Sequence, residues 1–211
     1  MPTRSPSGGH SKAGGLSVVE QLVVGLGDEL NFMDVAETVS AKVRAFLSTT
    51  TQVASGFAPE AAISLLLLAT SDVLAAGARL GAMVDVVPSE RFEPDAGREA
   101  DLDPLREGLA RLLDGLDDYV EVMDPVIDGR IGGSTVSGDI ALIAEALAKG
   151  LQHYDAGRRL EALWWWQFSY LSLWGERAAS VLRVLQMLLA HLRLDVEDDV
   201  AAEAEYDALH A

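Results

Sequence analysis

The sequence predicts an all-α fold, a single-domain bundle of about five to six helices. Apolar residues recur at three- and four-residue intervals through most of the chain, which is the pattern of a helix with one buried face. Glycines and prolines gather at a few places between these periodic segments. The composition is 49% hydrophobic but only 6% aromatic, and little of the chain shows the alternation typical of strands.

The 211 residues suit one domain with flanking segments. We expect residues 1–32 to be a mostly disordered extension, because their first half is rich in serine, glycine and proline. Residues 33–194 form the predicted helical domain. Residues 195–211 carry seven acidic residues and no lysine or arginine, which predicts an acidic disordered tail.

A first helical hairpin is predicted near the start of the domain. Asp34 can cap a helix that runs to about Ala54, and Gly56 ends it. Pro59 suits the first turn of a second helix, which reaches about Met83. The apolar residues of the first helix lie at helical spacing: Val35, Val39, Val43, Phe46 and Leu47.

A middle helix is predicted after a loop at 84–101. Asp101 or Asp103, together with Pro104, opens it, and Pro125 stops it. Its predicted apolar stripe is Leu105, Leu109, Leu112, Leu116, Tyr119, Val120 and Met123.

The second half of the domain predicts another helical pair. A flexible connection at 129–138 precedes a helix over about 139–154. After a turn at 155–157, a last helix extends to Leu194 with a bend near Gly175. Weak self-similarity at one offset suggests two similar helical hairpins with the middle helix between them. The matching pairs are Leu65 and Leu163, Ser71 and Ser169, Gly77 and Gly175, and Arg79 and Arg177.

The net charge of −17 bounds the classes of partner. A protein this acidic is repelled by phosphate backbones and anionic lipids, so we expect no direct nucleic-acid binding and no membrane binding. The most apolar run, 61–69, is too short to span a bilayer. The chain has no cysteine, which excludes disulfides and thiolate chemistry and fits a cytoplasmic protein.

No catalytic motif is present. The four histidines lack the spacing of zinc ligands, and no nucleophile elbow, phosphate loop or dinucleotide fingerprint occurs. We therefore expect no catalytic residue, metal site or cofactor, and the chain is more consistent with a binding protein than with an enzyme.

All four tryptophans lie within eleven residues, from Trp164 to Trp174. A helix turns about 100° per residue, so three consecutive rings cannot share one face. On a helical wheel Trp164, Trp166 and Trp174 have apolar neighbours, which predicts that they lie in the core. Trp165 lies in a polar stripe, so we expect Trp165→Ala to affect stability less than Trp164→Ala.

The stripe around Trp165 is one candidate binding surface. An exposed tryptophan beside small side chains is typical of a contact with a protein partner. Alternatively, another helix, the acidic tail or a second copy of the chain covers the ring. The candidate partner-binding residues are Trp165, Ser169, Ser172, Glu161 and Arg158.

A pocket between helices is the second candidate. Arg79 and Arg177 share faces with apolar residues, and a buried arginine needs a carboxylate such as Asp72 or Glu161. Structural ion pairs would explain the pattern. Alternatively, the arginines bind a small molecule or anion in a pocket made of Arg79, Asp72, Gln167, Tyr170 and Arg177.

The stretch at 150–175, GLQHYDAGRRLEALWWWQFSYLSLWG, resembles the signature of an actinobacterial family known only as a domain of unknown function (number 5063). The segment 76–97, AGARLGAMVDVVPSERFEPDAG, is also similar to it. The resemblance implies no activity, cofactor or catalytic residue. Members of this family tend to be encoded near a recombination-mediator protein and clamp-loader components, which implies a DNA-maintenance context.

Two classes of function remain. The first is a non-enzymatic protein-interaction or adaptor module, whose acidic charge would suit a basic, nucleic-acid-handling partner. The second is a binder of small molecules or anions, or an enzyme, with an arginine-lined pocket. Convergence of Arg79 and Arg177 without neutralising carboxylates would favour the second class.

Overall fold

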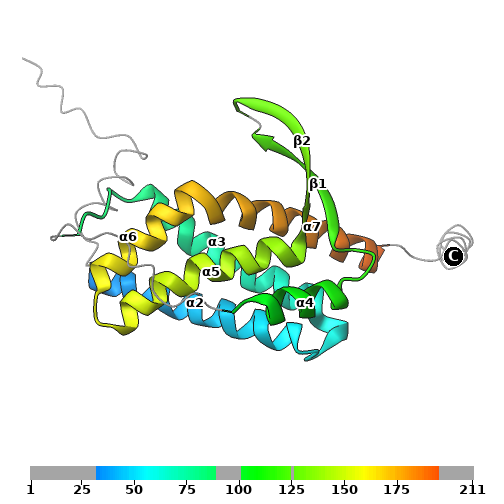
Figure 1. The fold of residues 1–211 in the computed structure, drawn as a ribbon, viewed down its shortest axis with the longest axis horizontal. Helices are drawn as coiled ribbons and strands as arrows, with labels where there is room; N and C mark the ends of the chain where they lie inside the picture. The colour runs from blue at the N-terminus through cyan, green and yellow to red at the C-terminus, as the bar shows by residue number, and fades with distance from the viewer. Residues whose placement is uncertain (1–31, 89–100, 125, 195–211) are drawn as a thin grey trace, which may run out of the picture. The chain divides into compact units, whose positions relative to one another are not determined.

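The computed structural model describes residues 32–88, 101–124 and 126–194. These residues form a mostly helical domain with one two-stranded sheet (Figure 1). The helical-bundle prediction is therefore confirmed. The predicted N-terminal extension and acidic tail lie outside the described residues, apart from the first residue of the first described helix.

The first helical hairpin has nearly the predicted bounds. Helix α2 spans Phe32–Ala54, and a short 3₁₀ turn, η1, spans Pro59–Ala61 and leads into α3, Ala62–Ala82. Gly56 adopts a φ of 88°, a left-handed conformation that glycine tolerates well, and the chain reverses there. Glycine and proline thus set this boundary through local backbone preferences.

The middle segment differs from the prediction. Helix α4 spans only Asp103–Leu112, and the residues that follow form an antiparallel hairpin. Strand β1 spans Asp118–Asp124, and strand β2 spans Asp128–Thr135. The expected helix to Met123 and the expected flexible connection at 129–138 are therefore wrong.

The physical reason lies in a turn and an alternating pattern. Gly115 has a φ of 78°, which ends the helical path. Beyond it, Tyr119 and Glu121 alternate with Val120 and Val122, and β-branched residues favour strands. The same residues also fit a helical stripe, so periodicity alone misassigned them.

The second half contains three helices in sequence. Helix α5 spans Val136–Asp155. Thr135 is its N-cap, and the Thr135 side chain accepts a hydrogen bond from the Gly138 amide. Helix α6 spans Arg159–Ser169, and α7 spans Gly175–Leu194.

A π-helical turn, η2, over Tyr170–Trp174 joins α6 to α7. The amide of Gly175 donates to the carbonyl of Tyr170, five residues earlier. This turn lies where the sequence predicted a bend. It adds about one residue to the helical count, so side chains beyond it rotate by roughly 100° relative to an uninterrupted helix.

Helix α5 is central to the core, because it packs against α2, α4, α6 and α7 (Figure 1). Helix α3 packs against α2 and α7. The largest fully buried side chains come from all these helices, from η2 and from the residue after α4: Trp166, Trp174, Phe46, Leu66, Leu80, Leu109, Leu113, Ile140, Ile143, Leu147, Leu163 and Leu185.

The apolar stretch that includes helix α3 is longer than the run at 61–69 from which the sequence expectation was drawn. Together with η1 it is long and apolar enough, by length and composition, to cross a membrane, so the argument from the short run at 61–69 was wrong. Leu66, Val73 and Leu80 are buried in the core. Packing inside the bundle accounts for part of this hydropathy.

Candidate functional site

The hairpin β1–β2 has two different faces. Tyr119 is paired with Ser134, and Val122 with Ile131, in an antiparallel register. Because side chains alternate along a strand, this register defines two sets. The inner face carries Tyr119, Glu121, Met123, Gly132 and Ser134; the outer face carries Asp118, Val120, Val122, Ile131, Gly133 and Thr135.

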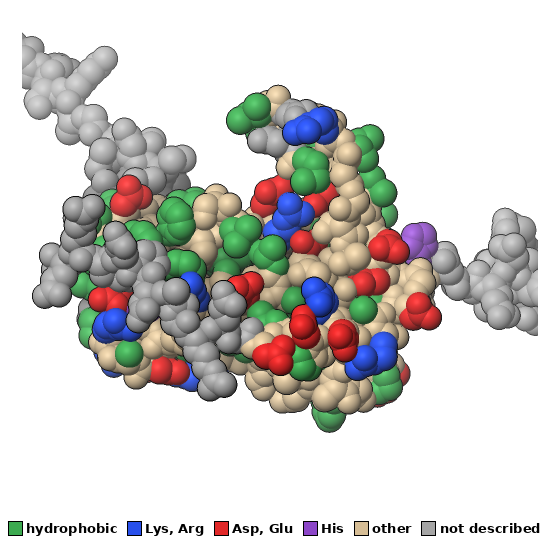
Figure 2. All heavy atoms as spheres, viewed as in Figure 1, with side chains coloured by type: hydrophobic (Ala, Val, Ile, Leu, Met, Phe, Trp, Pro, Cys, Tyr) green, Lys and Arg blue, Asp and Glu red, His purple; other side chains and the backbone are tan. Residues whose placement is uncertain are grey.

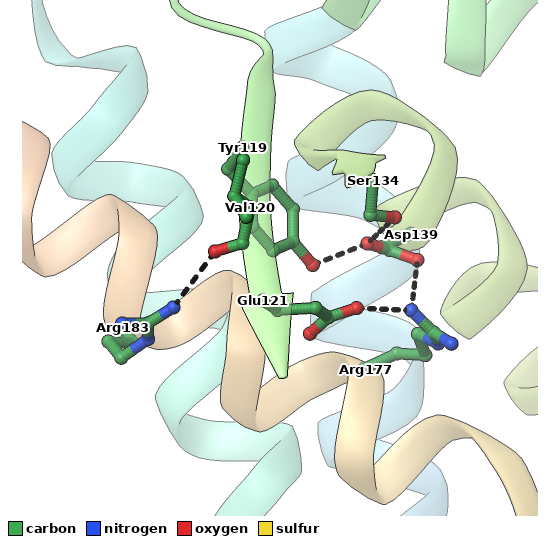
Figure 3. Close-up of polar contacts among 7 residues, drawn as sticks. All are labelled: Tyr119, Val120, Glu121, Ser134, Asp139, Arg177 and Arg183. Carbon is green, nitrogen blue, oxygen red and sulfur yellow. Dashed lines mark hydrogen bonds and ion pairs between the residues drawn. The ribbon is translucent and has the colours of Figure 1, made fainter. Parts of the chain in front are cut away.

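The inner face is bound to two helices by a polar cluster (Figure 3). The hydroxyl of Tyr119 donates to Oδ2 of Asp139 on α5 at 2.6 Å, and the Ser134 hydroxyl donates to the same atom at 2.7 Å. Arg177 on α7 pairs with Oε1 of Glu121 at 2.6 Å and lies 3.8 Å from Oδ1 of Asp139. The cluster therefore links both strands to α5 and α7.

Burial of its carboxylates makes this cluster sensitive to loss of a member. The Glu121 side chain is 4% exposed and that of Asp139 is 6% exposed. Burial, followed by the hydrogen bond to Asp139, raises the pKa of the Tyr119 hydroxyl, so it remains a donor. Burial tends to lower the pKa of Arg177, but Asp139 and Glu121 outweigh it and raise that pKa.

The base of the hairpin has further bonds to the helices. Asp117 accepts hydrogen bonds from the amide of Ser137 at 2.8 Å and from its hydroxyl at 2.6 Å. Arg183 of α7 donates to the carbonyl of Val120 at 3.4 Å (Figure 3). The hairpin is thus held at its base by side chains from both helices.

The outer face and the tip are apolar and open to solvent. Val120 is 65% exposed and Ile131 is 74% exposed, while Val126 and Ile127 in the turn are 89% and 85% exposed. Figure 2 shows apolar side chains along the hairpin where it stands clear of the helices. Exposed apolar residues on a strand pair are unusual in a soluble domain, because they invite association.

A hollow lies at the base of this face. It has a volume of about 380 Å³ and is lined mainly by outer-face residues. A Cβ atom at Gly133 would meet only the carbonyl of Tyr119, at 4.0 Å, so the missing side chain leaves open space. The hollow is lined by Asp118, Tyr119, Val120, Gly133, Ser134 and Thr135.

The tryptophan cluster is partly as predicted. Trp166 and Trp174 are buried in the core, as expected. Trp164, which was also expected in the core, is only half-buried. It stacks on the exposed ring of Phe168, with 5.2 Å between the ring centroids. Trp165 is also half-buried: its indole donates to the Ala146 carbonyl on α5 at 2.8 Å.

The predicted stripe around Trp165 is not one continuous surface. Ser169 is buried, donates to the Trp165 carbonyl and accepts from the Trp174 indole at 3.1 Å. Ser172, within the π-helical turn, is exposed, and its hydroxyl donates to the Phe168 carbonyl at 2.7 Å. Glu161 pairs with Arg158 at 3.1 Å, and with the buried His153 at the same distance.

The structure does not bring the predicted pocket residues together. Arg177 is paired with Glu121 on β1, whereas Arg79 is exposed on α3. Asp72 pairs with Lys42 at 2.7 Å rather than with an arginine. Arg177 therefore has a carboxylate partner on the hairpin.

The other two members have structural contacts. The buried amide of Gln167 donates to the Leu80 carbonyl and accepts from the Val86 amide, both at 2.8 Å, which holds the end of α3. Tyr170 packs edge-on against Trp174. None of the five lines the hollow on the hairpin, the hollow at the start of α6 or the larger one of about 560 Å³ between α4 and α5.

The hairpin was not among the candidate sites predicted from the sequence. A usable signal was present in Asp118–Asp124, DYVEVMD, which alternates polar and apolar residues around two valines. The glycines of Asp128–Thr135, DGRIGGST, were assigned to a flexible connection, although glycine in a strand also marks close approach by another backbone.

Comparisons with known proteins agree on the fold and assign no activity. None of the curated proteins is significantly similar to the chain. The crystal structure of protein BF1032 from Bacteroides fragilis is similar, with a TM-score of 0.60 and 16% identity over 76% of this chain and 93% of that one. At that identity the similarity shows the fold alone. The family model "Domain of unknown function (DUF5063)" matches residues 31–191, and the chain therefore belongs to that family.

Proposed function

We propose that this protein is a non-enzymatic interaction module that binds a protein partner through the outer face of its β1–β2 hairpin. The observation that supports this most directly is the exposure of Val120 and Ile131, at 65% and 74%, on a hairpin whose other face is anchored by buried charges. An isolated two-stranded hairpin is marginally stable in water. The anchoring keeps the apolar face in a defined orientation, which lowers the entropy cost of binding.

This proposal moves the contact surface away from the Trp165 stripe. Trp165 is half-buried, its indole donates to Ala146, and the Lys149 ammonium lies 5.0 Å from its ring centroid. These contacts support the alternative in which a neighbouring helix covers the ring. The paired state of Arg177 likewise offers no support for an arginine-lined pocket.

The charge favours a basic partner. With a net charge of −17, the chain attracts positively charged proteins and repels other acidic ones. Basic proteins that handle nucleic acids fit this requirement, so we place the module in a cytoplasmic DNA-maintenance context, as a partner of such a protein rather than of the nucleic acid.

Site-specific photo-cross-linking tests the proposal. A photoreactive phenylalanine analogue replaces Val122 or Ile131 in separate proteins, and Leu68 of α3, which is 65% exposed, carries the same group as the control. We expect both hairpin positions, but not position 68, to cross-link to the same protein in an extract of the source cells. Mass spectrometry identifies that protein.

Binding to the purified partner is then measured with Val122→Thr/Ile131→Thr. Threonine keeps the β-branched shape but has a hydroxyl in place of a methyl group of valine or the ethyl group of isoleucine. We expect the dissociation constant to rise at least about tenfold without loss of folding. Equal cross-linking from all three positions, or unchanged affinity in the double variant, would contradict the proposal.

A further inference from the structure

We infer that the partner contributes a basic, extended segment that pairs with the free edge of β2 as a third strand. This inference rests on the proposed function and specifies the chemistry of its partner. It follows from the open edge of the hairpin, the hollow above Gly133, and the acidic charge of the chain.

The two edges of the hairpin are not equivalent. The sheet has two strands, so each strand has one edge without a strand neighbour. The outer edge of β1 lies near α7 at the base of the hairpin, where Arg183 donates to the Val120 carbonyl. On β2, no backbone hydrogen bond from 131–135 reaches a third segment among the described residues. The β2 edge therefore offers backbone donors and acceptors to an incoming strand.

Glycine makes this edge approachable. Gly133 is exposed and has open space where a Cβ atom would lie. At Gly132, in contrast, a Cβ atom would overlap the sulfur of Met123 on the inner face, so the Met123 side chain would have to move. A strand with an uncovered glycine admits another backbone closely. The hollow of about 380 Å³ beside Gly133 can then accept an apolar side chain of that strand.

The charge selects the kind of strand. Asp118 is exposed and lines the hollow, and the whole chain carries a net charge of −17. A second copy of this chain would bring the same negative charge to the edge, which disfavours self-pairing. A segment that alternates apolar residues with lysine or arginine could pair with the β2 backbone and place its apolar side chains on the outer face. Its positive charges would be attracted by the acidic chain.

Synthetic peptides test the inference on the full chain. The probe is a short peptide that alternates valine and lysine. The first comparison peptide has glutamate for lysine, and the second keeps the lysines but carries N-methylated amides along one edge. We expect saturable binding of the first probe, at least about tenfold weaker binding of the other two, and chemical-shift changes with slowed amide exchange at Arg130–Thr135.

A glycine substitution separates binding from folding. Gly133→Val places a side chain at the hollow, where an added Cβ has no contact closer than 4.0 Å, and puts a residue of high β-propensity in the strand. We therefore expect at least about tenfold weaker peptide binding together with an unfolding midpoint that is unchanged or higher. Gly129→Ala is the matched control, because it lies in the same strand and has nothing within 4 Å of an added Cβ.

The outcomes distinguish this inference from the proposed function. Equal binding of the N-methylated probe, or shifts that map to α2 and α3, would overturn strand addition, while cross-links from Ile131 to a natural partner would still uphold the interaction module. Failure of every peptide to bind at millimolar concentration would also overturn strand addition. A dimer in sedimentation equilibrium that Gly133→Val abolishes would assign the edge to a second copy instead.

Discussion

Arg177 of α7 and Glu121 of β1 form an ion pair with 2.6 Å between Nη1 and Oε1, and the Glu121 side chain is 4% exposed. The two residues are 56 positions apart in the sequence. The pair lies beneath the inner face of the hairpin, so it couples the orientation of an exposed strand pair to the packing of the bundle. Hydrogen bonds from Tyr119 and Ser134 to Asp139 complete this anchor.

Loss of the Glu121 charge should destabilise the domain. Glu121→Gln leaves Arg177 with only Asp139, at 3.8 Å, as its carboxylate partner, and an incompletely paired buried charge is costly. Because Arg177 is 20% exposed, we expect the free energy of unfolding to fall by about 2 kcal/mol, which is less than for a fully buried pair. The unfolding midpoint should then fall by roughly 4–8 °C. Urea unfolding followed by circular dichroism measures the free energy, and thermal unfolding measures the midpoint.

An exposed ion pair provides the control. Lys42 and Asp72 also pair at 2.7 Å, but their side chains are 43% and 59% exposed. Asp72→Asn should therefore cost less than about 1 kcal/mol. If both substitutions cost the same, burial of the Glu121 pair does not strengthen it.

Tyr119 should make the domain more sensitive to alkaline pH. Its pKa is raised above the ordinary value of 10.0, mainly by burial. Below pH 10 the hydroxyl is protonated in both states, so its contribution to stability is complete. Above that pH the unfolded chain loses the proton first, and the free energy of unfolding falls as the pH rises.

The matched variant is Tyr119→Phe. Near neutral pH it should lose about 1–2 kcal/mol, because the 2.6 Å hydrogen bond to Asp139 is absent. Between about pH 8 and pH 11 its stability should fall less steeply than that of the wild type. Parallel slopes for the two proteins would show that Tyr119 titrates as an ordinary tyrosine.

Gly150→Ala should destabilise the protein, although alanine favours helices over glycine by about 1 kcal/mol. A Cβ atom at Gly150 of α5 would overlap the indole of Trp166 on α6. Displacing a buried ring costs about 1–3 kcal/mol or more, so the clash outweighs the gain in helix propensity. Thermal unfolding measures the sign, and a smaller penalty in a Trp166→Phe background would identify the ring as the cause.

Trp165 and Trp166 form a matched pair. Each indole donates to a carbonyl of α5, that of Ala146 at 2.8 Å and that of Leu147 at 3.0 Å. Trp166 is fully buried, whereas Trp165 is half-buried. We expect Trp165→Phe to lower the free energy of unfolding by about 1 kcal/mol, because the hydrogen bond is lost. Trp166→Phe should lower it by about 2–3 kcal/mol, because it also leaves a cavity. Equal costs would mean that burial contributes little here.

The expectation that Trp165→Ala lowers stability less than Trp164→Ala stays a prediction.

The helices were predictable because their signals are local. Gly56 and Pro59 bound a turn through their own backbone preferences, and the spacing of Val39, Val43 and Phe46 follows from the helical repeat. The bend near Gly175 was also predicted, because glycine allows the close approach of the Tyr170 carbonyl. The burial of Ser169 was not predicted, because its contacts with the Trp165 carbonyl and the Trp174 indole do not show on a helical wheel.

The sequence by itself determined the helical class, most helix boundaries, the acidic character and the burial of Trp166 and Trp174. Only the tertiary structure decided that Tyr119 and Glu121 belong to a strand and that Arg177 is paired rather than available for a ligand. Asp118–Asp124 fits both a helical stripe and an alternating strand. The choice between them depends on Asp139 and Arg177, partners that lie too far along the chain for any local pattern to include.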